Sequence, residues 1–580
     1  MKLRFSHSPA KRMSLIGSLI GTIENKLPSD RLILRILFFT LIGSLVTAGV
    51  MWSSANSSNS PVAGGTLKEG VIGTPRFVNP VLAVTRADQD MTALIYSGLM
   101  KINPQGDLVP DLADSITVSD DGKTYNVILK NNLRFHDDTP VTARDVAFTI
   151  GLVQNAELKS PLRGNWSDVT VEEIGEYELN ILLTKSYTPF IENFTLGILP
   201  KHIWSNLPIE QVPFSIKNTE PIGSGPFMID SFSKDESGLI STYELKKYAN
   251  NKPVIIGTVE VHFYQNEEAL GSAFANKEIT STAQLAVADV IALKDSNTYS
   301  IMTEPLPRVF AIFFNQNRSP ALRDTAVRLA LTTAIDRDLL VDEALSGFGV
   351  PIKYPVPSNH PAVESMSQTV TAGTSSAKQS AETILVRSGW IKNNTGGWEK
   401  RIDGEIKKLS IVLKTANTPS FEATTEFIAR AWRELGVEVQ VEQFEQSDLL
   451  QAVIRPRDFE GLLFGLDMNR AVDLYPFWHS SQREDPGLNI SQYANIEVDR
   501  LLDRARVATS TEIQITATKD ALQIFSRETP AAFLYVPQLV YVHDSTIKIT
   551  PMEQISRPQE RFMNVSDWNM SEEKLWPFFK

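Results

Sequence analysis

LSIVLKTANTPSFEATTEFIARAWRELGVEVQV, which spans residues 409–441, contains two short apolar runs separated by a longer amphipathic segment. Residues 409–414 and 437–441 are rich in leucine, isoleucine and valine, so they predict two buried strands. Residues 420–435 carry apolar side chains at helical spacing and predict a helix between them. A strand, a helix and a second strand in this order are typical of an α/β protein.

Two segments that precede this unit in the chain support the same prediction. Asp324 predicts an N-cap for a helix over residues 324–345, which has apolar residues along one face. These residues are Val327, Leu331, Ala334, Ile335 and Leu339. Residues 107–130 predict a β-hairpin, because Asp120-Asp121-Gly122 separates two runs of alternating apolar side chains. The sequence therefore predicts a two-lobed α/β protein.

A segment rich in aromatic and charged residues follows at 465–505, GLDMNRAVDLYPFWHSSQREDPGLNISQYANIEVDRLLDRA. Its first half fits neither helical nor alternating spacing, so it predicts an irregular loop. Ring side chains are crowded there beside charged and amide groups: Tyr475, Phe477, Trp478 and His479, with Asp467, Asn469, Arg470 and Asp473. Such loops bind ligands more often than they fill cores, although the aromatic residues could instead fill the seam between two domains.

The N-terminal part of the chain predicts a membrane segment. Residues 36–52, ILFFTLIGSLVTAGVMW, contain no charged side chain, and residues 32–34 extend the apolar stretch towards the length that spans a bilayer. Basic residues precede it, so the positive-inside rule predicts a short basic cytoplasmic segment over 1–35 and an external body. We expect an uncleaved transmembrane anchor, with a cleavable signal peptide as the alternative. Residues 53–64 predict a flexible linker.

Composition narrows the classes of function. The 580 residues have a formal net charge of −12, and basic residues concentrate in the first 52, so the body is acidic and a poor partner for nucleic acid. The chain has no cysteine, which excludes disulfides, thiolate metal ligands and cysteine nucleophiles. It contains no Walker, G-x-S-x-G or H-E-x-x-H motif. We therefore expect no enzyme activity, no cofactor and no metal site.

Several motifs resemble those of one protein family. Residues 110–150, PDLADSITVSDDGKTYNVILKNNLRFHDDTPVTARDVAFTI, closely resemble the signature of family 5 extracellular solute-binding proteins, the oligopeptide, dipeptide and nickel receptors of ABC importers. LPKHIW at 199–204, GSGPF at 223–227 and FFNQNRSPALRDTAVRLALTTAIDRDLLVDEALSGFGVP at 313–351 also look like that family's motifs. The resemblance covers nearly everything from residue 65 onward.

The resemblance implies a two-lobed fold like that of the periplasmic binding proteins (type II, cluster C) with an extra subdomain, here preceded by one N-terminal transmembrane helix. We expect lobe I at residues 65–300 with the extra subdomain at about 86–205. Lobe II is expected at 301–529, and a C-terminal return to lobe I at 530–580.

The function implied is that of the substrate-binding component of an ABC importer. The chain is expected to capture a peptide or similar small solute by hinge closure and to deliver it to the permease transmembrane subunits. We expect a monomeric ectodomain, held at the outer face of the cell membrane by the single-pass helix. A membrane-anchored ligand sensor or scaffold without transport and a surface hydrolase are the alternatives.

The binding loop departs from the family pattern at one position. Peptide-binding members hold the ligand's amino terminus with an aspartate three residues before an Asp-Pro or Glu-Pro pair; here Asp473-Leu474 stands at the pair and Arg470 precedes it. A guanidinium group binds carboxylate or phosphate and not ammonium, so we expect Arg470 to favour an anionic ligand, with a salt bridge as the alternative. The predicted ligand-binding residues are Arg470, Asp473, Asp467, Trp478, Tyr475, Phe77, Asn79, Tyr96, Trp166, Phe310, Asn315 and Trp390.

Overall fold

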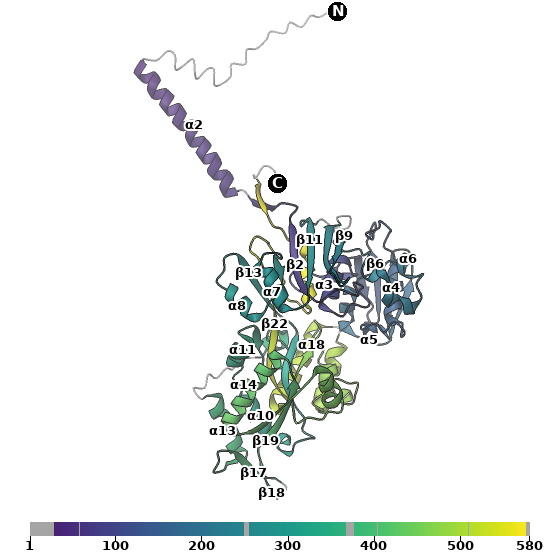
Figure 1. The fold of residues 1–580 in the computed structure, drawn as a ribbon, viewed down its shortest axis with the longest axis vertical. Helices are drawn as coiled ribbons and strands as arrows, with labels where there is room; N and C mark the ends of the chain where they lie inside the picture. Colours follow the sequence, from purple (N-terminus) through teal and green to yellow (C-terminus); the bar gives the residue numbers. More distant parts are fainter. Residues whose placement is uncertain are drawn as a thin grey trace, which may run out of the picture. The chain divides into compact units, whose positions relative to one another are not determined.

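The computed structural model describes residues 28–56, 58–248, 254–366, 376–402, 404–508 and 510–575 (Figure 1). They belong to two compact units, Met1–Val62 with Ser571–Lys580, and Ala63–Met570. Most of the cytoplasmic segment predicted over residues 1–35 lies outside the described residues.

The smaller unit consists of helix α2 (Pro28–Asn56) and two short antiparallel strands, β1 (Ser58–Pro61) and β23 (Glu572–Leu575). Its regular structure differs from the linker predicted over residues 53–64, because the helix continues to Asn56 and the chain then pairs with the C-terminal strand. No helix among the described residues is both long and apolar enough to cross a membrane. The span predicted over residues 36–52 is therefore not supported; the Trp52 side chain lies outside those described.

The larger unit is built on a mixed sheet whose strands are shared between two lobes. In spatial order they are β20 (Glu438–Phe444), β19 (Ser410–Ala416), β21 (Gly461–Asp467), β14 (Arg308–Phe314), β22 (Ala531–Asp544), β12 (Ser281–Thr282), β2 (Thr66–Ile72), β11 (Thr258–Tyr264), β10 (Ile240–Lys247) and β9 (Phe227–Lys234). Two further strands, β13 (Tyr299–Pro305) and β15 (Gly349–Pro351), also pair with β22. Figure 1 shows β22 running from one lobe into the other.

The chain crosses from the second lobe to the first within strand β22, because the two ends of this strand lie in different hydrophobic cores. Its first residues, 531–536, pack in the cores of the second lobe, which otherwise draw on residues 309–525. Tyr541 packs in the core of the first lobe, with residues 67–261 and 547–568. The chain therefore passes back to the first lobe near Pro537, several residues after the predicted boundary at 529/530.

The predicted strand–helix–strand unit is confirmed. Strands β19 and β20 are parallel, and helix α14 (Pro419–Leu435) connects them. Pro419 at the first helical position suits a helix start, and Gly436 ends the helix in the left-handed region at φ 99°. The apolar face of α14 is buried, with Ile428 and Trp432 fully covered. This packing explains why a sequence pattern of period 3.6 is sufficient to locate the helix.

The helix predicted over residues 324–345 is in fact two helices, α10 (Thr325–Thr333) and α11 (Arg337–Leu345). Asp324 caps the first as predicted, since its carboxylate accepts a hydrogen bond from the Ala326 N–H at 3.0 Å. Asp336 caps the second in the same way through the Leu339 N–H, so the chain turns there. Because of this break Leu339 is 46% exposed and does not share the buried face predicted for it.

The first lobe carries a separate four-stranded sheet, β5 (Ala113–Val118), β6 (Thr124–Leu129), β8 (Glu178–Leu183) and β7 (Val169–Glu173). Its first two strands form the predicted hairpin, and Gly122 in the turn has φ 68°. The elements that contribute residues to the cleft between the lobes are helix α3 (Arg86–Ile95), helix α5 (Arg163–Trp166), the 3₁₀ helix η1 (Thr188–Thr195), helix α16 (Tyr475–Trp478), helix α17 (Ile496–Arg506) and the 3₁₀ helix η6 (Pro558–Phe562).

Candidate functional site

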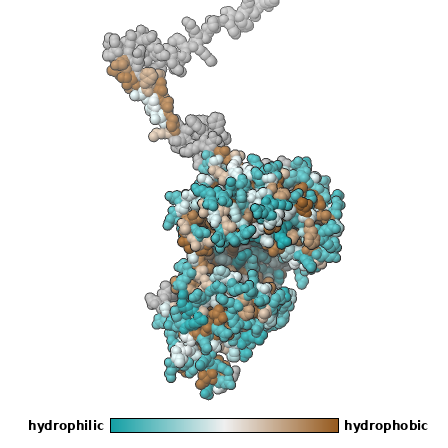
Figure 2. Space-filling view, in the orientation of Figure 1, coloured by the Kyte–Doolittle hydropathy of each residue, from teal (hydrophilic) through white to brown (hydrophobic). Residues whose placement is uncertain are grey.

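A cavity of about 1180 Å³ lies between the two lobes, and the surface of the unit is hollowed there in Figure 2. The first lobe contributes residues from α3, α5 and η1, together with the segment around η6. The second lobe contributes residues 467–476 and the end of α17. Small-molecule pockets typically have volumes of roughly 300–1,000 Å³, so this cavity is large enough for an extended solute.

The second-lobe side of the cavity is formed by the predicted irregular loop, which follows β21. Met468 and Leu474 are buried in the core of that lobe and fix the loop at both ends. Between them Val472 has φ 50°, a strained value for a β-branched residue, and its N–H donates to the Asn469 carbonyl. This tight turn directs Asn469, Arg470 and Asp473 at the first lobe.

Arg470 makes all its recorded contacts with the first lobe. It forms an ion pair with Glu560, and its Nη1 donates to the Gly106 carbonyl at 2.9 Å and to the Gln554 carbonyl at 3.4 Å. The side chains of Arg470 and Glu560 are only 13% and 12% exposed. The guanidinium group of Arg470 is therefore already bound within the protein. This geometry favours the salt-bridge alternative over the predicted binding of an anionic ligand by Arg470.

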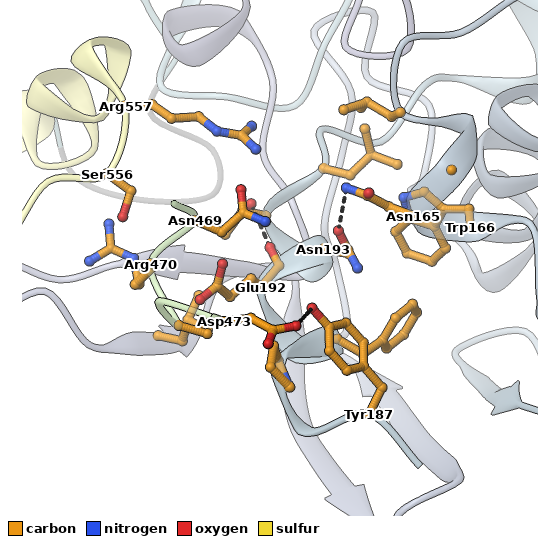
Figure 3. A pocket seen from close by; sticks show the side chains of 18 of the residues that line it. Asn165, Trp166, Tyr187, Glu192, Asn193, Asn469, Arg470, Asp473, Ser556 and Arg557 are labelled. Atoms are coloured by element: carbon orange, nitrogen blue, oxygen red, sulfur yellow. Dashed lines mark hydrogen bonds between the residues drawn. The ribbon is translucent and has the colours of Figure 1, made fainter. Parts of the chain in front are cut away.

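Asp473 takes part in a second set of contacts between the lobes. Its carboxylate accepts a hydrogen bond from the Tyr187 hydroxyl at 3.4 Å and lies 3.4 Å from Arg506 Nε (Figure 3). The Arg506 guanidinium stacks on the rings of Tyr187 and Tyr475, at 4.8 and 4.3 Å from their centroids. Burial, with a smaller contribution from Asp473, raises the pKa of Tyr187 to about 12. Tyr187 is thus a neutral hydrogen-bond donor at physiological pH.

Three other predicted residues also line the cavity. Asp467 lies 3.4 Å from Arg308 Nε in a half-exposed pair. Tyr96 is 5% exposed, and its hydroxyl donates to the Val78 carbonyl at 3.4 Å. Trp166 is 2% exposed and packs edge-on against Phe190, with ring centroids 5.2 Å apart. The structure therefore brings six predicted residues to one cavity: Arg470, Asp473, Asp467, Tyr475, Tyr96 and Trp166.

The other six predicted residues do not line it, and each has a structural role instead. Trp478 is fully buried among Phe313, Phe525 and Phe533, and Trp390 is buried in the other core of the second lobe. The remaining four are Phe77, packed on the first-lobe core; Asn79, bonded to the Asn218 side chain; Phe310, stacked on Tyr535; and Asn315, which donates to the Arg457 carbonyl. Aromatic and amide side chains are used in cores as well as in sites, and sequence alone did not separate the two uses.

Several polar residues of the cavity were not predicted. Figure 3 shows Glu192 beside Asn469 and Asp473, with Arg557 extending towards the same space. Asn165 and Asn193 are joined by a hydrogen bond of 3.1 Å on the first-lobe side. Burial raises the pKa of Glu192 to about 7, while Arg470 and the Ala471 N–H partly oppose the shift. These residues belong to short segments without periodicity, so no sequence signal indicated them.

The chain matches the family model of bacterial extracellular solute-binding proteins, family 5, over residues 107–484. It belongs to this family.

Known relatives of this solute-binding protein match most of its length. The oligopeptide-binding protein AppA of Bacillus subtilis is 29% identical over 498 residues, which cover 84% of this chain and 88% of AppA. The structure of AppA in complex with a nonapeptide matches with a TM-score of 0.64 and 26% identity, over 88% of this chain and all of that one. The ABC transporter substrate-binding protein CtaP of Listeria monocytogenes shares the fold, with a TM-score of 0.71 at 24% identity over 88% of this chain and 99% of CtaP.

The polar groups of this solute-binding protein's cleft are carboxylates, guanidinium groups, amides and hydroxyls. Among the residues that the structure describes, no three or more His, Asp or Glu side chains gather in a way that could hold a metal ion. The arrangement can therefore supply hydrogen bonds and charge to an organic solute, with tryptophan, tyrosine and proline surfaces for its apolar parts.

Proposed function

We propose that this chain captures a peptide, or a solute of similar size and polarity, between its two lobes and releases it to a membrane permease. Family membership gives the general role, the substrate-binding component of an ABC importer. The observation that carries the choice of ligand is the volume of the cleft, about 1180 Å³, which is large enough to hold a short peptide. AppA, the relative with 29% identity, binds a nonapeptide in its solved structure.

The expected mechanism is closure of the two lobes about β22 and the neighbouring strands. The direct contacts between the lobes, through Arg470 and through Asp473 with Tyr187, would form as the cleft closes. A solute that touches both lobes drives closure only by its differential affinity for the closed form. We also propose lobe I at 65–300, the extra subdomain at about 86–205 and lobe II from 301; the separate four-stranded sheet over residues 113–183 supports the subdomain.

The location of the N-terminal segment remains a proposal that rests on the sequence. We propose that the apolar residues of 36–52 hold the body at the outer face of the membrane. Fractionation of cells that express the full chain tests it: the chain is expected in the membrane fraction, resistant to carbonate extraction. Release of the body into the soluble fraction would overturn the anchor without affecting the proposed solute binding.

Native mass spectrometry on the purified body, residues 63–570, tests the function. We expect the native mass to exceed the mass of the protein because peptides are bound. Denaturation should release these peptides, and added synthetic peptides should displace them. A body that carries no solute and binds no peptide from a defined library in calorimetry would refute the proposed ligand class. Release of a non-peptide compound instead would keep the binding role and change the solute.

A further inference from the structure

The basic residues that line the second-lobe side of the cleft, or face it, have carboxylate partners within the protein. The pairs are Arg470 with Glu560, Arg506 with Asp473 at 3.4 Å, and Arg308 with Asp467 at 3.4 Å. Each pair is locally neutral, so a solute that used one of these groups would first have to compete with the internal partner. Recognition of a charged solute group therefore requires a cleft residue that is not already paired.

Glu192 is such a residue. It lies on η1, lines the cavity, and is near the backbone N–H of Ala471 in the facing loop. Within the described part of the chain, no lysine, arginine or histidine forms an ion pair with its carboxylate. One N–H cannot satisfy a carboxylate, which offers about four acceptor positions, so most of its acceptor capacity faces the cavity.

The charges around Glu192 do not compensate its burial. Arg470 and Ala471 face it from the second-lobe loop, Arg557 and Glu560 from the C-terminal segment, and Tyr187 from the residue that precedes its own helix. Arg470 is held by Glu560, whose negative charge also acts on Glu192. Desolvation dominates and brings the pKa of Glu192 to about 7. Glu192 is half-buried, and a cation placed against its carboxylate stabilises the charged form.

We propose that Glu192 is a specificity-determining residue of the cleft and that it receives a protonated primary amine of the solute. This inference rests on the proposed function, because it assumes that solute enters this cavity. An ammonium group donates three hydrogen bonds and would fill the open acceptor positions of the carboxylate. The neighbouring Ala471 N–H favours the charged form of the carboxylate, which is the form that an ammonium group binds. A solute whose amine is acetylated would instead leave the buried carboxylate without a cation.

Binding of an amine should also change the protonation of Glu192. With a pKa of about 7, the carboxyl group is about half protonated at pH 7, and an ammonium partner lowers its pKa. The group then loses its proton as the complex forms. Amine-containing solutes should therefore release a measurable fraction of a proton per molecule bound at pH 7.

The test uses three tetrapeptide libraries with native mass spectrometry of the 63–570 body. One has free amino termini and no lysine, one is N-acetylated without lysine, and one is N-acetylated with lysine. We expect the amine-free library to bind about tenfold more weakly or worse than at least one other, and the three libraries identify which amine is used. Glu192→Gln, which keeps the side-chain shape, should abolish the discrimination. Glu210→Gln, an exposed residue of the same lobe outside the cavity, is the matched control and should retain it.

Calorimetry with a bound tetrapeptide in two buffers of different ionisation enthalpy measures the proton release, which Glu192→Gln should remove and Glu210→Gln should not. Equal retention of all three libraries by the unmodified body would overturn the role of Glu192 while leaving solute binding intact. Unchanged discrimination or proton release in Glu192→Gln would overturn it as well. Failure of every library to bind would instead overturn the proposed peptide function, together with the inference that depends on it.

Discussion

Replacement of Arg470 by methionine separates its two possible roles. The methionine keeps much of the side-chain volume and removes the Glu560 ion pair and the two hydrogen bonds to the Gly106 and Gln554 carbonyls. All three partners lie outside the second-lobe core that holds the loop, so the loss weakens the contact between the lobes. If Arg470 were a ligand anchor, the same change would affect anionic solutes alone.

The free energy lost in Arg470→Met follows from the burial of the Arg470–Glu560 ion pair. A hydrogen bond to a charged group contributes about 1.5–3 kcal/mol when little water reaches it. The two side chains are only 13% and 12% exposed, but the ion pair also carries a desolvation cost, so we expect a net loss of about 2 kcal/mol from the closed form. When the open form predominates, this loss lowers the affinity for every solute by about 30-fold.

Calorimetric titration of the solute recovered from the native protein measures the affinity. Dyes on two introduced cysteines, one in each lobe, report closure, because the chain has no cysteine of its own. A double-mutant cycle with Glu560→Gln should give a coupling energy of about 1 kcal/mol or more. Arg430→Met is the matched control, since its pair with Glu343 is 50% and 44% exposed and lies within the second lobe. Undiminished affinity and closure in Arg470→Met, or a loss confined to anionic solutes, would refute the interlobe role.

Three further predictions concern stability. Arg561→Met leaves the buried carboxylates Glu69 and Asp90 without their shared cation and should lower the free energy of unfolding in urea by about 3–5 kcal/mol; a loss below about 1 kcal/mol would contradict this. Burial lowers the pKa of His136 to about 4, so between pH 6.5 and 4 the unfolded chain binds the extra proton and stability falls with acidification, by about 3 kcal/mol at pH 4 from this group; His136→Gln should flatten the profile by that amount. Trp478→Ala should cost about 3–5 kcal/mol in thermal or urea unfolding and leave solute selectivity unchanged, and a selective change in ligand preference would contradict its placement in the core.

Regular elements could be predicted because their side-chain spacing is dictated locally. The alternation around Gly122 and the period of 3.6 in α14 located a hairpin and a helix correctly. The break at Asp336 was missed because a single capping carboxylate interrupts a pattern that remains periodic on both sides. The boundary in β22 was missed for a related reason, since a long strand gives no local signal at the residue where it leaves one core for another.

The candidate site was predicted mainly in the binding loop, and of the residues predicted elsewhere only Tyr96 and Trp166 line the cavity. Arg470 and Asp473 stand out in sequence by their type and their aromatic neighbours. Their partners are 90 and 33 residues further along the chain, at Glu560 and Arg506, and no local pattern connects them. Whether an arginine in such a loop meets a solute or another part of the protein depends on these distant partners, so the sequence could state the alternatives and the contacts were needed to choose.

The same contacts bear on where selectivity resides. Met468 and Leu474 anchor the second-lobe loop in a core, and Arg470 and Asp473 connect it to the first lobe, so a substitution in this loop alters closure for every solute alike. A residue can change which solute is preferred, without changing closure for every solute, only if most of its hydrogen-bonding groups face the cavity. Glu192 meets that condition, since it lines the cavity and forms no ion pair with any described residue. Variation in solute preference should therefore map to the first-lobe side of the cleft, and variation in overall affinity to the loop.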